Sequence, residues 1–350
     1  MPIAIEGGRV PLLLQRSKAF ELALSSGDET NHPFSDSLRI ALINNMPDAA
    51  LEDTALQFFE LLSGAAANSR VSLKLFSLPN VPRSDLGRQH LNNFYTDISE
   101  LFNGRFDAII VTGTEPKRPD LREEPYWAAL VEVLSWAEEN TSSAVLSCLA
   151  AHAGVLARDG IPRNPLSDKQ FGVFEYKKTS THALTKGIGD SMRMPHSRWN
   201  EVKADALTAS GYQVLTQSAT AGSDLFVKQM KRSLFVHFQG HPEYGTRTLL
   251  KEYRRDIKRF LRRERDTYPS MPHEYFNAVA SQLLADFQAK ALSNPREEAL
   301  ADFPEGAVAV TVQNTWQASA ATVYRNWLQY LQSKKSEHRA DVAMAPVIRA

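Results

Sequence analysis

Residues 144–157 read Ala-Val-Leu-Ser-Cys-Leu-Ala-Ala-His-Ala-Gly-Val-Leu-Ala, and this stretch decides the fold. Residues 144–147 form an apolar run of strand length, and the small residues that follow favour a helix. Cys148 therefore lies at a strand-to-helix corner, where a side chain is presented at the carboxyl edge of a parallel sheet and a helix N-terminus favours the thiolate. Cys148 is also the only cysteine of the chain. A lone cysteine is by default a buried structural thiol. Other residues of the chain therefore have to support the interpretation of Cys148 as a nucleophile.

The segments around this corner alternate between strand and helix patterns. Strand patterns cover 38–43, 71–76, 106–111 and 144–147, and helical spacing covers 51–62 and 126–137. This alternation predicts an α/β fold with a doubly wound, mostly parallel sheet flanked by helices. Ligands bind such folds at the carboxyl ends of the strands, so the loops after Ile43, Val111 and Ser147 are the candidate site.

We expect the chain to divide into three parts. These are an N-terminal arm over residues 1–37, a core over 38–265 and a helical extension over 266–350 that packs on the core and ends in a frayed tail. Further strand patterns lie at 171–176, 212–216, 225–228 and 234–238, and helical patterns at 246–263, 274–292 and 318–332.

The bulk composition limits the class of protein. A length of 350 residues with 43% hydrophobic residues suffices for a substantial core. Forty basic residues balance forty acidic ones, so nothing favours a nucleic-acid or anionic-membrane partner, and acidic substrates would need local charges. A single cysteine excludes an intrachain disulfide, no apolar run reaches membrane-spanning length, and the first residues lack a secretion-signal pattern. The sequence predicts a globular cytoplasmic protein that acts on small molecules.

A histidine follows the last strand pattern of the core. Gly240-His241-Pro242-Glu243-Tyr244 comes directly after residues 234–238, so His241 shares the sheet edge with Cys148 if both strands belong to one sheet. A cysteine nucleophile needs a base, and the base usually needs an orienting carboxylate, here Glu243. A surface turn would explain this short run equally well. Combined with the position of Cys148, however, the run favours a Cys148–His241–Glu243 triad.

Backbone amides near the corner are candidates for an oxyanion hole. Gly113 lets amides approach a ligand, and the N–H of Leu149 begins the cysteine helix. We therefore predict an oxyanion site formed by the backbone of Leu149, Gly113 and Thr114. The alternative for Gly113 is a tight turn at the end of a strand.

Three basic residues flank the predicted site. Lys169 and Arg198 lie at loop-like positions, and Arg255 lies on the charged helix 246–263. They are candidates for holding a substrate carboxylate only because of this location, since most lysines and arginines are solvated surface charges. His152, one turn into the cysteine helix, is more simply explained as a satisfied helix histidine.

Several motifs, in this order along the chain, resemble the homoserine O-acyltransferases of methionine biosynthesis. They are His90-Leu91-Asn92-Asn93-Phe94-Tyr95, the Cys148 corner, Pro195-His196-Ser197-Arg198, Gly240-His241-Pro242-Glu243-Tyr244, Asn314-Thr315-Trp316 and Asn326-Trp327-Leu328-Gln329-Tyr330. The likeness extends over about residues 38–263 and resumes near the C-terminus. Those enzymes resemble class I glutamine amidotransferases in fold, so the resemblance implies that fold here.

The resemblance also implies a ping-pong acyl transfer with acyl-CoA as co-substrate, no bound cofactor or metal, and a homodimer. Cys148 would take the acyl group as a thioester, His241 would deprotonate the hydroxyl of the amino acid, and Glu243 would orient His241. The matching motifs assign the substrate pocket to Lys169, Ser197 and Arg255, with Arg255 binding the carboxylate of the amino acid.

The chain also departs from the family pattern. The departures are Asp48-Ala49 in place of a frequent lysine pair, Leu149 in place of the usual tryptophan, Thr114-Glu115-Pro116-Lys117-Arg118 in place of an Ala-Pro continuation, and an atypical insertion at 273–304. These differences bear on the choice of substrates more than on the chemistry.

The position that matches Lys117 is associated in the family with the choice of acyl group. Glutamate there goes with acetyl transfer and a small residue with succinyl transfer, and Lys117 is neither. Lys117 or Arg118 would attract the free carboxylate of a succinyl group, by about 1 kcal/mol in water and about four times that near a partly dry surface. We therefore predict succinyl-CoA as donor and L-homoserine as acceptor. Acetyl-CoA and L-serine are the alternatives, because one methylene of the acceptor is worth only about 1–3 kcal/mol.

The sequence is also compatible with two other classes of protein. A glutamine amidotransferase or related hydrolase has the same fold, but it typically has glycines on both sides of the cysteine, where this chain has Ser147 and Leu149. A non-catalytic binding or regulatory protein would use Cys148 as a structural thiol. Acylation of Cys148 by an acyl-CoA separates an acyltransferase from both.

Overall fold

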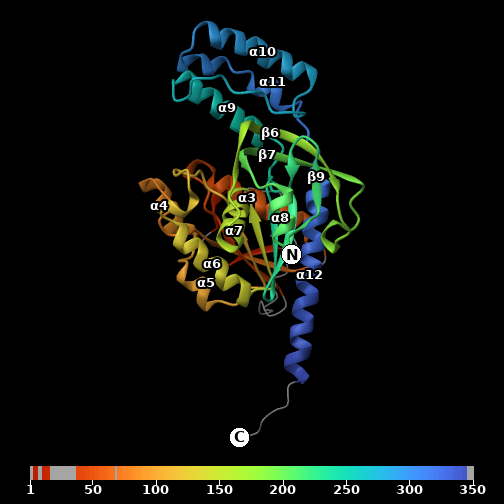
Figure 1. Cartoon of the computed structure of the whole chain (residues 1–350). Coiled ribbons are helices and arrows are strands. Elements are labelled where there is room, and N and C mark those ends of the chain that lie inside the picture. The colour runs from red at the N-terminus through yellow and green to blue at the C-terminus, as the bar shows by residue number, and fades with distance from the viewer. Residues whose placement is uncertain (1–2, 7–9, 16–36, 68, 345–350) are drawn as a thin grey trace.

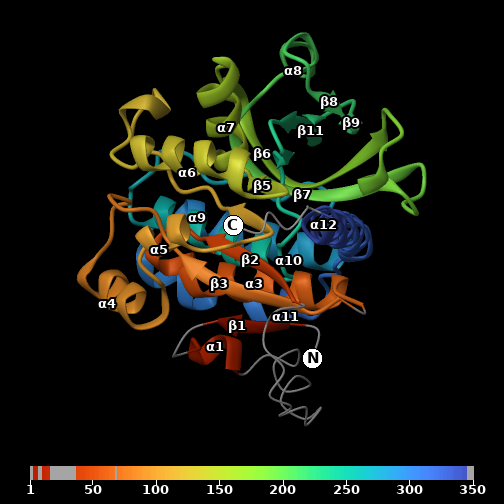
Figure 2. The same ribbon diagram turned by 90° about the horizontal axis from the view of Figure 1, so that it is seen from below.

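The computed structural model describes residues 3–6, 10–15, 37–67 and 69–344, and an eight-stranded sheet lies at its centre (Figures 1 and 2). The spatial order is β1 (Ile3–Glu6), β3 (Val71–Phe76), β2 (Leu38–Ile43), β4 (Ala108–Val111), β5 (Ser143–Ser147), β12 (Ser233–Phe238), β11 (Leu225–Met230) and β8 (Gln213–Val214). From β1 to β12 all neighbours are parallel, whereas β11 is antiparallel to both β12 and β8. The predicted α/β fold with a mostly parallel sheet is confirmed.

Helices cover both faces of this sheet, as Figure 2 shows. One face carries α3 (Asp48–Ala65) and α12 (Gln317–Met344), and the other carries α6 (Trp127–Asn140) and α7 (Leu149–Asp159). The central strands are apolar throughout because alternate residues serve the two layers. In β2, Ile40 and Leu42 join the α3 side, while Ala41 and Ile43 join the α6 side. Shorter helices are α1 (Leu12–Gln15), α4 (Asp85–Phe94), α5 (Ser99–Asn103), α8 (Ala204–Ala209), and the 3-10 turns η2 (Leu121–Glu123) and η3 (Ala183–Thr185).

A second sheet follows the cysteine helix. Its order is β10 (Gly222–Ser223), β9 (Thr216–Ser218), β6 (Asn164–Lys178) and β7 (Ser191–Glu201), all antiparallel. The expectation that Lys169 and Arg198 lie in loops is therefore wrong, since they lie in β6 and β7. The register shift between Pro165 and Gln170 interrupts the alternation of β6, which hid the strand in the sequence. The predicted strand at 212–216 is divided at Leu215 between β8 and β9.

The last third of the chain forms helices that pack in two places. α9 (Thr248–Leu261), α10 (Ala278–Ser293), the 3-10 turn η4 (Glu297–Asp302) and α11 (Glu305–Ala309) form a layer at the top of Figure 1, with their own apolar cluster. α12 returns to the main sheet, where buried Trp327 donates from Nε1 to Ser143 Oγ at 2.9 Å. The last residues, 345–350, and most of the predicted arm lie outside the described residues, and the three-part division stays a prediction. Among the described helices, none is both long and apolar enough to cross a membrane.

Candidate active site

Four loops meet at the carboxyl edge of the main sheet because the strand registers align the ends of the strands that precede them. Ile43 pairs with Val111, Val111 pairs with Leu146, and Ser147 pairs with Phe238. The residues that follow β2, β4, β5 and β12 are therefore neighbours, although they are far apart in the sequence. Cys148 and His241 share one edge of one sheet, as the sequence predicted.

Cys148 has a backbone conformation that few side-chain-bearing residues adopt. Its φ is 54° and its ψ is −115°. Its N–H donates to Phe238 O at 2.8 Å, and its carbonyl accepts from Ala151 N at 3.0 Å in the first turn of α7. Such strain costs on the order of 1–3 kcal/mol and persists where the surroundings determine it, which is common at active sites. The turn leaves the thiol partly exposed at the N-terminus of α7.

His241 is held between a thiol and a carboxylate. Its Nδ1 lies 2.9 Å from Glu243 Oε1, and its ring is also hydrogen-bonded to Cys148. Ser147 Oγ donates to Glu243 Oε1 at 3.3 Å, and the Tyr244 ring stacks on the imidazole at a centroid distance of 4.1 Å. This is the geometry of a nucleophile, a base and a residue that orients the base.

The electrostatics of the triad favour a charged imidazole. Burial alone would lower the pKa of His241, but the charges of Cys148 and Glu243 and its hydrogen bonds to both raise that pKa well above its ordinary value. The contacts with Cys148 and Glu243 therefore favour the imidazolium form of His241.

The backbone opposite the thiol is open at Gly113. A Cβ added to Gly113 would lie 2.9 Å from both the nitrogen and the Cβ of Leu149, so only glycine leaves the Leu149 N–H accessible. Asn45 holds this segment, because its N–H donates to Thr112 Oγ1 at 2.8 Å and its Oδ1 accepts from Leu78 N at 2.9 Å. The predicted oxyanion residues thus lie together around the start of α7.

The loop that carries His241 is fixed to the second sheet. His241 N donates to Pro195 O at 2.9 Å, and Gly240 N donates to Asp224 Oδ1 at 2.7 Å. A Cβ on Gly240 would lie 2.6 Å from Met194, so glycine permits this close contact with β7. Burial raises the pKa of Asp224 to about 6, although the Gly240 N–H and Arg198 oppose the shift.

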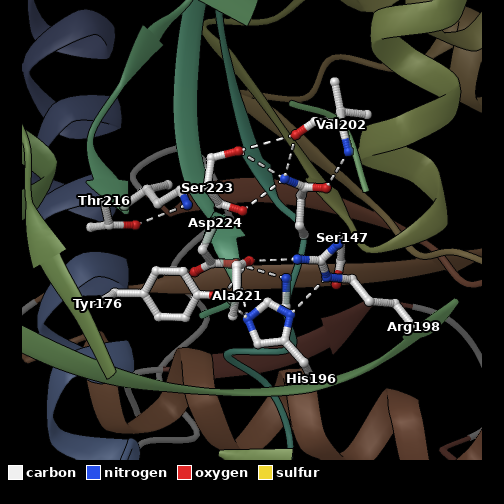
Figure 3. A network of polar contacts seen from close by, with 12 residues as sticks. Ser147, Tyr176, His196, Arg198, Val202, Thr216, Ala221, Ser223 and Asp224 are labelled. Carbon is white, nitrogen blue, oxygen red and sulfur yellow. Dashed lines mark hydrogen bonds and ion pairs between the residues drawn. The ribbon is translucent and has the colours of Figure 1, made fainter. Parts of the chain in front are cut away.

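A buried polar network, drawn in Figure 3, supports that loop. His196 lies between Tyr176 OH at 2.8 Å and Arg198 Nε at 3.2 Å. Arg198 also donates to Ala221 O at 2.8 Å and to Asn200 O at 2.7 Å, and it is only 3% exposed. A carboxylate-binding role for Arg198 is therefore wrong, because its guanidinium is enclosed and engaged with protein groups.

Comparisons with known proteins identify the family. Residues 14–338 match the model of the family described as homoserine O-succinyltransferase. The chain belongs to this family of O-acyltransferases. It is 44% identical to a homoserine O-succinyltransferase of Methylorubrum extorquens, over 88% of this chain and 91% of that protein. It is 43% identical to a homoserine O-succinyltransferase of Rhodopseudomonas palustris, over 85% of this chain and 89% of that protein.

Solved structures similar to this chain include glutamine amidotransferases. That from Thermotoga maritima is 12% identical, covers 84% of this chain and 98% of its own, and has a TM-score of 0.44. The one from Methylobacillus flagellatus is also 12% identical, covers 84% of this chain and 95% of its own, and has a TM-score of 0.47. These scores are low, and the architecture rests on the strand order itself.

The three residues predicted to bind substrate in this family member lie in one charged cluster beside His241. Ser197 Oγ is hydrogen-bonded to Glu252, whose Oε1 accepts from Tyr244 OH at 2.6 Å. The two cations are joined by Asp256, which lies 2.8 Å from Lys169 Nζ and 3.1 Å from Arg255 Nη2.

Glu252 and Asp256 were missed in the sequence, although their spacing of four residues on one helix was visible. Tyr244 connects the cluster to the triad, because its ring stacks on His241 while its hydroxyl contacts Glu252.

The other predicted polar residues are exposed or are already hydrogen-bonded within the protein. Lys117 and Arg118 are exposed, and their N–H groups donate to Glu124 Oε1 at 2.5 and 2.6 Å. Buried His152 is hydrogen-bonded to Gln239 Oε1 at 2.9 Å, which confirms a satisfied helix histidine. The described residues contain no group of three or more His, Cys, Asp or Glu side chains that could hold a metal ion.

Replacing the thiol tests the electrostatic coupling of the triad. In Cys148→Ala the negative charge beside the imidazole is lost, so we expect the pKa of His241 to fall toward its ordinary value. The measurement is an NMR titration of histidine-labelled protein, with the His241 signal assigned by its absence in His241→Asn. An unchanged His241 pKa in Cys148→Ala would show that the two groups do not interact.

Proposed function

We propose that this chain transfers a succinyl group from succinyl-CoA to the hydroxyl of L-homoserine through a thioester on Cys148, as a step of methionine biosynthesis. Membership of the family supports the choice of substrates. The observation that carries the mechanism is the contact of Cys148, at its strained turn, with the His241–Glu243 pair. The homodimer implied by the family resemblance belongs to the same proposal.

In the first half-reaction the Cys148 thiolate attacks the thioester carbonyl of succinyl-CoA. The negative charge that develops on the carbonyl oxygen is stabilised by the N–H of Leu149 and the open backbone at Gly113 and Thr114. The carbon–sulfur bond to CoA then breaks, CoA leaves as a thiolate, and His241 supplies its proton. The products are a succinyl thioester on Cys148 and free CoA.

In the second half-reaction L-homoserine replaces CoA. Acylation has removed the thiolate charge beside His241, so the imidazole is now neutral and acts as a base. It takes the proton of the homoserine hydroxyl while the oxygen attacks the thioester, and the Cys148 thiolate is released. Glu243 keeps the ring oriented through both steps, since it accepts from Nδ1 at 2.9 Å.

The cluster beside His241 matches a zwitterionic amino acid in charge. Lys169 and Arg255 balance Glu252 and Asp256, so neither sign is in excess. The Arg255 side chain is 48% exposed and therefore has donors free for the homoserine carboxylate, while Glu252 can accept from the ammonium group. Lys169, only 12% exposed, and Ser197 line the pocket and hold these two acids in place.

The thioester is tested by mass spectrometry after incubation with succinyl-CoA in the absence of an acceptor. We expect a mass gain of one succinyl group confined to Cys148, removed by hydroxylamine and lost in Cys148→Ala. Because the chain has one cysteine, the assignment is unambiguous. The absence of an adduct with either succinyl-CoA or acetyl-CoA would contradict acyl transfer and favour a structural thiol.

Two neighbouring arginines of α9 form a matched pair for testing the acceptor site. Arg255→Gln should raise the KM for homoserine by about 10- to 100-fold, because a charge-assisted hydrogen bond is lost, while the KM for succinyl-CoA stays unchanged. Arg254→Gln is the control, since Arg254 pairs with Glu305 at 3.2 Å on the surface, and it should change either KM by less than about twofold. Equal effects of the two substitutions in steady-state kinetics would remove Arg255 from the acceptor site.

A further inference from the structure

Arg163 lies between the cysteine helix and β6 and contacts the loop that leads away from Gly113. Its Nη2 donates to Pro119 O at 3.2 Å and to Arg118 O at 3.5 Å. The residue is half-buried. No carboxylate of the described residues lies within ion-pair distance of its guanidinium, which is therefore a charged group with several donors and no ionic partner.

Tyr126, which interacts electrostatically with Arg163, has a polar group without a partner in the described part of the chain. Its side chain is 4% exposed, and its hydroxyl is buried without a hydrogen-bond partner among the described residues. Tyr126 lines a small apolar pocket together with Gly113, Thr114 and Leu149, the residues of the oxyanion site. Because buried hydroxyls in native proteins are nearly always paired, this one points to a group that arrives with a ligand.

The charge of Arg163 reaches both Tyr126 and the nucleophile. Burial lowers the pKa of Arg163, whereas Tyr126, Glu124, Asp120 and Cys148 act in the opposite direction. Glu124 is oriented away from an ion pair with Arg163: one of its oxygens accepts two backbone N–H groups of the Lys117–Arg118 loop, and the other is buried without a hydrogen-bond partner among the described residues. The guanidinium stays charged, and it interacts electrostatically with Cys148, which would carry the acyl group.

We infer that the Arg163 guanidinium and the Tyr126 hydroxyl form a subsite for the free carboxylate of the acyl group that Cys148 carries. The inference rests on the proposed function and assigns the acyl specificity to residues that the sequence did not single out. A succinyl group extends two methylenes beyond its thioester carbonyl, and the pocket beside Leu149 offers apolar walls for them. Exposed Lys117 and Arg118 then contribute only long-range attraction from the surface.

Succinyl-CoA and butyryl-CoA provide the matched probes, since butyryl has the same chain length with a methyl group in place of the carboxylate. The variants are Arg163→Gln and Tyr126→Phe, and the readout is kcat/KM for each thioester with homoserine saturating. Arg122→Gln is the control, because Arg122 lies in the same loop, is 64% exposed and pairs with Asp120 at 2.7 Å.

We expect Arg163→Gln to lower kcat/KM for succinyl-CoA by about 10- to 100-fold and Tyr126→Phe by about 3- to 10-fold, since a charged partner and a neutral donor are lost. With butyryl-CoA, kcat/KM of both variants should stay within about threefold of that of the unmodified enzyme. Arg122→Gln should keep kcat/KM within the same range for both thioesters. Arg163→Lys should recover part of the loss, because the charge remains without the planar fork.

Three results would overturn the inference. An equal loss with both thioesters in Arg163→Gln would assign the arginine to the CoA moiety or to support of the 118–119 loop. An unchanged preference for succinyl-CoA in both variants would remove the subsite. A clear preference of the unmodified enzyme for acetyl-CoA would also contradict it, while leaving the thioester chemistry intact. Failure of every thioester to acylate Cys148 is a separate outcome, which refutes the proposed function itself.

Discussion

The strained backbone of Cys148 is the constraint on which the rest of the site depends. A φ of 54° is unfavourable for a residue with a side chain, and it is held because Cys148 N is bonded to Phe238 O while α7 begins at the next residue. The parallel pairing of β5 with β12 therefore fixes the turn and, through the same strand, the start of the His241 loop. One pair of strands therefore positions both Cys148 and the start of the His241 loop.

The second sheet completes this arrangement from the other side. β7 touches the His241 loop through Pro195 O and leaves no room for a side chain at position 240. Buried Asp224 receives the Gly240 N–H, and the His196–Arg198 network maintains the shape of β7 next to it (Figure 3). A buried hydrogen-bonded network of this kind rigidifies its surroundings, which suits the role of base that we propose for His241.

Local sequence patterns predict much of the fold. The parts that depend on contacts between distant segments cannot be predicted from such patterns. The apolar runs that became β2, β4 and β5 were clear because strands covered on both faces tolerate few polar residues. The antiparallel pair of β6 and β7 was not clear in the sequence. Its solvated face and irregular register make the segments that contain Lys169 and Arg198 look like loops. The His241–Glu243 pair could be predicted because the two residues lie only two positions apart in the sequence. Glu252, Tyr126 and Arg163 were not singled out, because their importance arises from contacts between segments that only tertiary structure brings together.

The two sides of Cys148 differ in chemistry. A charge-balanced cluster on α9 and the second sheet lies on the side of His241, and an apolar pocket lined by Tyr126, whose hydroxyl has no partner among the described residues, lies beside Leu149. We propose that the acyl group rests on Cys148 between the two half-reactions. Rapid mixing of enzyme with succinyl-CoA without homoserine tests this proposal by following released CoA thiol. We predict a burst of one CoA per active site followed by slow hydrolysis. Release of CoA only after homoserine is added would contradict it, because the acyl group would then pass directly between the two substrates.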